Sequence, residues 1–160
     1  MKTVEVEVGV PDGMQLIIGQ AHFIKTVEDL YEALVTSMPG ARFGVAFCEA
    51  SGKSLVRTDG SDPALERLAQ GYAASIGAGH VFVVVLGGAF PINVMNRIKA
   101  VDEVVGIYCA TSNPVTVLVG DTGRGRGVLG VVDGTAPKGL ETEADRAERR
   151  DFLRKIGYKR

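Results

Sequence analysis

Residues Val81-Phe82-Val83-Val84-Val85-Leu86 form an uninterrupted apolar run in the middle of the chain. This run of β-branched and apolar residues has no polar alternation, which is typical of a central strand covered on both faces. A helix is predicted to begin at Pro91, and a strand is predicted to return over residues 104–109. The three segments together predict a βαβ crossover at the deepest part of a sheet.

Segments on either side of this crossover complete the predicted architecture. Valine and glutamate alternate over residues 4–8, and the turn Pro11-Asp12-Gly13 predicts that this strand forms a hairpin with residues 16–19. Helices are predicted to begin at the capping residues Thr26, Asp62 and Thr142, and further strands at 43–47, 55–57, 115–119 and 128–132. Because hairpins and crossovers are interspersed, we expect an α/β fold of the α+β-like kind, with a mixed β-sheet flanked by helices in a single domain over residues 1–160.

Composition narrows the class of protein further. The 160 residues are 46% hydrophobic and 23% charged, which is typical of a globular domain and excludes disordered, collagenous and coiled-coil chains. A formal net charge of -1 predicts no binding to nucleic acid or to an anionic membrane. Cys48 and Cys109 lie in apolar runs, so we expect buried thiols in a reducing compartment. With no signal peptide and no apolar run long enough to span a membrane, we expect a cytoplasmic protein.

Two segments resemble nucleotide-binding motifs in their residue types, but neither has the neighbouring residues or secondary structure that its motif requires. Gly52-Lys53-Ser54 resembles the end of a P-loop, but position 47 is Phe47 where that motif needs glycine. The pattern Gly125-x-Gly127-x-x-Gly130 runs into a predicted strand where the dinucleotide fingerprint requires a helix. Neither a P-loop nor a Rossmann site is therefore predicted.

The segment Asp121-Thr122-Gly123-Arg124-Gly125-Arg126-Gly127 remains a candidate anion site. Exposed backbone N–H groups and the guanidinium groups of Arg124 and Arg126 are suited to phosphate oxygens. A solvated hairpin loop explains the same composition equally well. Asp133 lies beyond this loop and is either a further ligand-binding group or part of the next turn.

The two histidines, His22 and His80, are candidate nucleophiles or bases because their unperturbed pKa lies near neutrality. His22 stands between Gln20 and Lys25, just before a predicted helix N-terminus of the kind that favours anions. His80 precedes the buried strand at 81–86. A structural role in a strand connection is the alternative for both.

Asparagines and arginines supply the remaining candidates. Asn93 and Asn96 near the start of the third predicted helix offer amides to a polar ligand, although capping and solvation explain them as well. The charged helix near the C-terminus carries arginines among acidic residues, which indicates a solvated face with ion pairs.

The same residues carry a resemblance to the adenosine-specific kinase family, a small prokaryotic group. The matching blocks are Gly19-Gln20-Ala21-His22-Phe23-Ile24-Lys25-Thr26-Val27-Glu28-Asp29-Leu30, Gly79-His80-x-Phe82, Phe90-Pro91-Ile92-Asn93-Val94, Cys109-Ala110-Thr111-Ser112-Asn113-Pro114, the stretch from Gly125 to Gly134, and the stretch from Arg150 to Lys159. They follow one another in order over nearly the whole chain.

The resemblance implies an α/β homo-oligomer, a trimer, that binds adenosine or AMP and carries a phosphorylated histidine. On this chain the histidine would be His22, with His80 as the alternative. In that chemistry an imidazole nitrogen attacks a phosphoryl group and cationic Lys25, Arg124 or Arg126 spread its charge.

In the same scheme Asn93 and Asn96 would hydrogen-bond the adenine or ribose, and a 5′-hydroxyl would accept the phosphoryl group. The sequence identifies neither the phosphoryl donor nor a need for Mg²⁺, and no metal-ligand motif is visible. Two hypotheses follow: phosphotransfer to adenosine through a phosphohistidine, or a sensor that binds AMP or adenosine without turnover. The first is the leading hypothesis, and the missing P-loop makes the sensor a serious alternative because no known ATP site is visible. A purely structural oligomer is a third reading.

Overall fold

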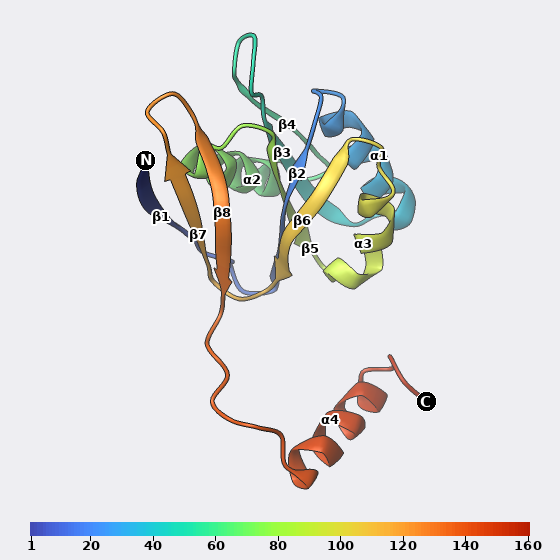
Figure 1. Ribbon diagram of the computed structural model, residues 1–160. Coiled ribbons are helices and arrows are strands. Elements are labelled where there is room, and N and C mark those ends of the chain that lie inside the picture. The colour runs from blue at the N-terminus through green and yellow to red at the C-terminus, as the bar shows by residue number, and fades with distance from the viewer.

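Two antiparallel sheets and four helices make up the protein in the computed structural model, which describes residues 1–160 (Figure 1). The larger sheet has the strand order β4-β3-β5-β2-β6, with β2 (Met14–Ala21), β3 (Arg42–Cys48), β4 (Val56–Gly60), β5 (Val81–Gly87) and β6 (Val104–Thr111). The smaller sheet has the order β1-β7-β8, with β1 (Lys2–Val8), β7 (Val115–Asp121) and β8 (Arg126–Asp133). The helices are α1 (Thr26–Ser37), α2 (Pro63–Ile76), α3 (Pro91–Lys99) and α4 (Glu143–Lys155).

Strand β5 is the centre of the core, as its sequence predicts. All of its residues are buried, and alternate side chains point into two different hydrophobic clusters. Val81, Val83 and Val85 pack with α2 and with the smaller sheet. Phe82 and its alternate neighbours pack with α1 and α3 on the other face. The expectation of an α/β fold with helices on both faces of a sheet is therefore confirmed.

The pairing of the strands differs from the expectation in two respects. Every hydrogen-bonded strand pair is antiparallel, so the sheet contains no parallel pair. Strands β5 and β6 do run in the same direction through the α3 crossover, but β2 lies between them and pairs with both. The hairpin predicted between residues 4–8 and 16–19 is wrong, because β1 pairs with β7 in the smaller sheet while β2 enters the larger one.

Helix α2 is held closely against the larger sheet. Asp62 caps it by accepting hydrogen bonds from the backbone N–H groups of Ala64 and Leu65, and Pro63 begins it, as predicted. The helix crosses β3 at Gly44, where a Cβ would lie 2.3 Å from the backbone of Leu65. The absence of a side chain at this position is therefore what allows the close approach of helix and strand.

Helix α4 lies apart from the rest of the fold. An extended segment, residues 134–142, carries it away from the end of β8 (Figure 1). Its predicted cap is confirmed, because Thr142 accepts from the backbone N–H of Asp145 in a capping box. None of its residues is buried. No helix in the protein has the length and apolar character that crossing a membrane requires.

Candidate functional site

One end of the larger sheet gathers segments from three strands. The backbone N–H of Ala21, at the end of β2, donates to the carbonyl of His80 over 2.9 Å. The backbone N–H of His80 donates in turn to the carbonyl of Cys48, at the end of β3, over 2.8 Å. Because β2 and β3 flank β5, the residues that follow Ala21 and Cys48 meet His80 at the same edge.

His80 occupies a constrained position at this edge. Its φ of 65° lies in the left-handed region, and Phe23 has a φ of 73°. Such a conformation costs about 1–3 kcal/mol for a residue with a side chain and is concentrated at functional sites. The His80 imidazole stacks on the ring of Phe47, with 5.8 Å between ring centroids and 17° between the planes. Since Phe47 is buried in the core, it fixes the plane of the imidazole.

A cavity of about 290 Å³ opens beside this stacked pair. We call it the aromatic cavity; its lining residues are Phe23, Ile24, Phe47, Glu49, Ala50, Ser51, Gly52 and His80. Phe23 is 58% exposed and offers an aromatic face. A volume near 300 Å³ is at the small end of ligand pockets, and aromatic walls suit a flat heterocycle.

Glu49 is the one carboxylate among the residues that line the aromatic cavity. It accepts hydrogen bonds from the backbone N–H of Leu55 and from the Arg57 guanidinium, over 2.8 and 2.9 Å. The Leu55 N–H, and secondarily Arg57, hold the pKa of this carboxyl below its usual range. Glu49 is therefore an ionised hydrogen-bond acceptor for an N–H or O–H group in the cavity.

His22 begins a turn, residues 22–25, that we call the His22 turn; the next two residues of this turn, Phe23 and Ile24, line the aromatic cavity. The backbone N–H of His22 donates to the carbonyl of Glu103 over 2.9 Å. Thr26 does not cap α1 with its side chain as predicted; its buried hydroxyl donates instead to the carbonyls of His22 and Phe23. These bonds hold the turn while the His22 side chain stays exposed to solvent.

Lys25 closes the same turn and pairs with two carboxylates. Its ammonium group donates to Asp29 and lies 3.6 Å from Glu103, which is only 3% exposed. The hydrogen bond with Asp29 raises the pKa of Lys25, and the same bond lowers the pKa of Asp29. Neither oxygen of Glu103 has a hydrogen-bond partner.

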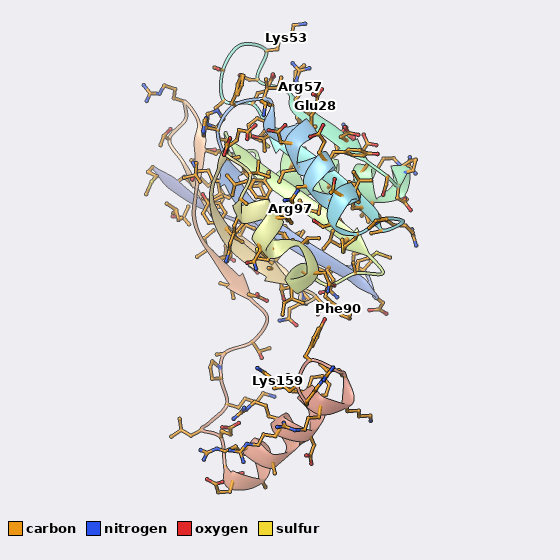
Figure 2. The ribbon with its side chains drawn as sticks, turned by 90° about the vertical axis from the view of Figure 1, so that its right-hand side faces the viewer. Glu28, Lys53, Arg57, Phe90, Arg97 and Lys159 are labelled. Carbon is orange, nitrogen blue, oxygen red and sulfur yellow. The ribbon has the colours of Figure 1, made fainter.

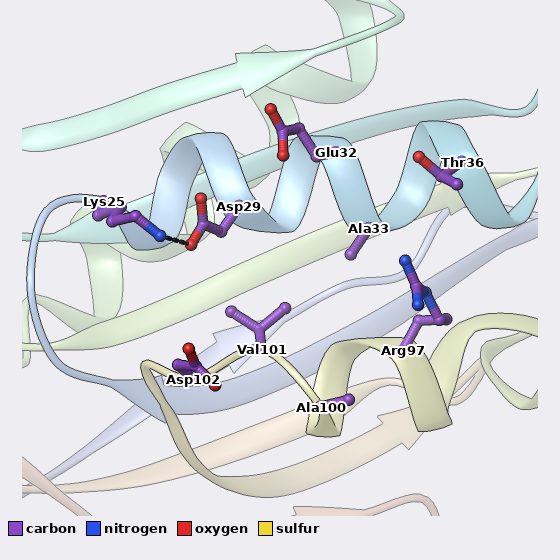
Figure 3. Close-up of a pocket in the computed structure, with 9 residues that line it drawn as sticks. All are labelled: Lys25, Asp29, Glu32, Ala33, Thr36, Arg97, Ala100, Val101 and Asp102. Atoms are coloured by element: carbon purple, nitrogen blue, oxygen red, sulfur yellow. Dashed lines mark hydrogen bonds and ion pairs between the residues drawn. The ribbon is translucent and has the colours of Figure 1, made fainter.

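A second cavity, of about 340 Å³, lies between α1 and α3 on the far side of Lys25 (Figure 3). Figure 3 shows Asp29 on α1 and Arg97 on α3 facing this space. It has no histidine and no aromatic side chain among its lining residues. It therefore lacks the groups that favour stacking or nucleophilic chemistry, which the aromatic cavity and His22 provide.

Gln20, Arg124 and Arg126 lie toward the His80 end of the fold and differ in what they contact. The Gln20 side-chain oxygen accepts from the Tyr108 hydroxyl over 3.0 Å. Arg126 pairs with Asp121 over 3.0 Å, and its guanidinium lies against Gly77 in the loop that leads to His80. Arg124 is exposed in the β7–β8 loop and forms no ion pair.

Three of the predicted site residues lie at the opposite end. Asn93 accepts from the backbone N–H of Phe90 and so caps α3, and Asn96 is exposed on the same helix. Asp133 accepts from Thr111 and Asn113, over 2.8 and 3.0 Å, at the far end of β8 from Arg126. Figure 2 shows this separation, with Lys53 of the β3–β4 loop at one end of the body and Phe90 at the other.

Sequence reasoning missed Phe23, Phe47, Glu49 and Glu103. Phe23 follows His22 directly, so its position was accessible, but its left-handed backbone was not. Phe47 and Glu49 read as strand and turn residues, and only the register of β3 against β5 brings them to His80.

Two of three comparisons with known proteins found matches. A family model described as adenosine specific kinase matches residues 6–159. The crystal structure of the PH1918 protein from Pyrococcus horikoshii OT3 is similar in fold, with a TM-score of 0.95. That protein is 48% identical to this chain, and the match covers 99% of this chain and 98% of the other. No curated protein matches the chain.

Proposed function

The chain belongs to the adenosine-specific kinase family, and on that premise we propose that it binds adenosine or AMP in the aromatic cavity. The observation that carries this proposal is the His80–Phe47 stack beside the exposed ring of Phe23. Stacking of a base on an aromatic side chain contributes about 1–3 kcal/mol. The cavity volume of about 290 Å³ suits a nucleoside rather than a larger cofactor.

The proposal also includes a preference for adenine over guanine, which would rest on Glu49. Adenine has an exocyclic amino group, which would donate to the ionised carboxylate of Glu49. Guanine presents a carbonyl at the position of this amino group, which the carboxylate would repel in the same orientation; its N1–H and 2-amino donors would reach Glu49 only if the base turned in the cavity. We therefore expect adenosine to bind more tightly than guanosine.

The phosphoryl acceptor in this proposal is His22. Its side chain is exposed and directly precedes Phe23, which lines the aromatic cavity, whereas the His80 ring is held against Phe47. A neutral His22 nitrogen attacks the phosphorus of a phosphoanhydride donor, forming a P–N bond while the P–O bond breaks and its electron pair leaves with the donor. The 5′-hydroxyl of adenosine then attacks this phosphorus, the P–N bond breaks, and the hydroxyl proton passes to solvent.

Cationic groups near the His22 turn would stabilise the charge in both steps. Lys25 closes this turn, and Arg126 reaches the loop before His80. Each would have to exchange its present carboxylate partner for phosphate oxygens, a geometry that guanidinium and ammonium groups both allow.

Mg²⁺ fits this scheme through Asp29 and Glu103. Phosphoryl-transfer sites usually hold Mg²⁺ by one or two carboxylates together with substrate phosphates. No group of three ligating side chains is present, so these two carboxylates would be the protein's share of the ligands. Neither Glu103 oxygen accepts a hydrogen bond, and one lies 3.6 Å from the Lys25 ammonium group, so Mg²⁺ would take the place of that ammonium group beside the two carboxylates. When bound, the ion would neutralise charge on the phosphates.

A sensor that binds AMP or adenosine without turnover is the second candidate. It is favoured by the position of the Gly125-x-Gly127-x-x-Gly130 pattern, which lies on and beside β8 and opens no helix. With no P-loop in the sequence either, the chain has no recognisable triphosphate site.

Product formation separates the two candidates. The protein is incubated with adenosine, Mg²⁺ and a panel of phosphoryl donors, and AMP is sought by mass-resolved chromatography. The kinase proposal predicts AMP and a phosphorylated peptide containing His22, both lost in His22→Ala and kept in the control Asn96→Ala. Tight adenosine binding with no AMP from any donor would favour the sensor, and a modified peptide that survives His22→Ala would move the role to His80.

A further inference from the structure

Helix α4 and its connecting segment form an arm, residues 135–160, that makes no specific contact with the rest of its own chain. Every hydrogen bond and ion pair formed by residues 141–160 stays within the arm. No strand or other helix packs substantially on α4. The ribbon of the arm is separate from the ribbon of the body in both views, apart from the connecting segment (Figures 1 and 2).

The arm nevertheless carries apolar side chains that a free helix would not keep in water. Phe152 is 56% exposed and Ile156 is 44% exposed, and their spacing of four residues places them on one face of α4. Tyr158 adds a third exposed ring just beyond the helix end. A helix of 13 residues is marginal by itself, so most of its stability must come from packing of such a face.

The direction of the arm is not peculiar to this chain. The likeness to the Pyrococcus horikoshii structure extends over 99% of this chain with a TM-score of 0.95. A TM-score this high requires residues 135–160 to superimpose together with the body. The corresponding arm of the Pyrococcus horikoshii protein must therefore leave its body in the same direction. An arm that nothing held would have no reason to share one direction between two proteins that differ at half of their residues.

The charges of the two parts are complementary. Residues 143–160 contain seven Lys and Arg against four Asp and Glu, whereas residues 1–134 contain ten against fourteen. The arm is therefore basic and the body acidic, so the surface that suits the arm is provided by another copy of this chain.

We propose that α4 is an exchanged arm that packs its Phe152 and Ile156 face on the body of a second copy of this chain. The arrangement buries the exposed apolar side chains of the arm and pairs its basic residues with the acidic body. This inference is independent of nucleoside binding, because it concerns the mass of the assembly and not the ligand.

The test is the mass of the full-length protein in solution by light scattering after gel filtration. The wild type should be an oligomer, and the double variant Phe152→Asp with Ile156→Asp should have the mass of one chain. Circular dichroism should show that the body keeps its sheet content, since α4 contributes nothing to the core.

Ala147→Asp is the matched control, because it introduces the same charge on the opposite face of α4. It should leave the oligomer unchanged. A wild type that is monomeric would overturn the proposal and point to an arm that folds on its own body or on another partner. An oligomer that survives the double variant would also overturn it, because the arm would then not hold the copies together.

Discussion

Replacement of Gly44 by alanine tests the seating of α2 on β3. A Cβ at Gly44 would lie 2.3 Å from backbone atoms of Leu65 and Glu66, whereas ordinary contact begins at 3.4 Å. The helix would have to withdraw by about 1 Å, and a gap of that size removes about a quarter to a half of the dispersion energy of each affected contact.

The expected cost follows from this geometry. Overpacking an interior usually costs about 1–3 kcal/mol, and we expect about 3 kcal/mol for Gly44→Ala because the obstructing atoms are backbone and cannot rotate away. For a domain of this size the midpoint of thermal unfolding should fall by about 6–12 °C. Urea unfolding followed by circular dichroism measures the free energy directly.

Gly71→Ala is the matched control, since it makes the same chemical change within α2. A Cβ at Gly71 meets no atom within 4 Å. Alanine is favoured over glycine in a helix interior by about 1 kcal/mol, so this variant should be more stable than the wild type. A Gly44→Ala protein as stable as the wild type, or two variants that change in the same direction, would refute the packing described for α2.

Three further predictions concern the thiols, acid stability and the core. Burial raises the pKa of Cys48 and of Cys109 to about 11, so neither thiol should react with a disulfide reagent at pH 8 until denaturant is added; fast labelling of the native protein would contradict this. Arg42, together with backbone N–H groups, lowers the pKa of Asp62 below its ordinary value of 3.8. The ionised Asp62 carboxylate therefore stabilises the fold above pH 3.8, and this stabilisation is lost as the pH falls through the lower pKa of the folded state. The stability difference between wild type and Asp62→Ala in urea should therefore shrink at low pH, and a difference independent of pH would show that the carboxylate charge is unimportant. Phe82 is fully buried, so Phe82→Ala should destabilise the protein by about 3–5 kcal/mol in urea unfolding, and a cost below about 1 kcal/mol would be inconsistent with its place in the core.

Local patterns predicted the elements well where the cause of the structure is local. The uninterrupted run at 81–86 identified β5 because burial on both faces leaves no polar positions. Asp62-Pro63 identified the start of α2 because capping involves only adjacent residues. The predicted hairpin of residues 4–8 failed because the turn at 11–13 indicates a change of direction but does not select a partner. The valines of β1 pair instead with those of β7, more than 100 residues away.

The candidate site was likewise predictable from the sequence only where its residues are neighbours along the chain. Gln20, His22 and Lys25 were found together because they share one short segment. The position of this segment beside His80, through the backbone bond of Ala21, depends on the register of β2 against β5, which the sequence pattern does not determine. Asn93 was a candidate because it stands near the start of a helix that follows a strand, and the fold positions it at the other end of β5.

Isothermal titration of adenosine into the wild type and into Phe23→Leu tests the nucleoside site itself. Leucine keeps an apolar side chain at this exposed position but removes the aromatic face, and stacking is worth about 1–3 kcal/mol. Adenosine should bind the wild type more tightly than guanosine does. The Phe23→Leu substitution should weaken the binding of adenosine by about 5- to 150-fold. Equal affinity of both proteins for adenosine, or no binding to either, would contradict a nucleoside site in the aromatic cavity.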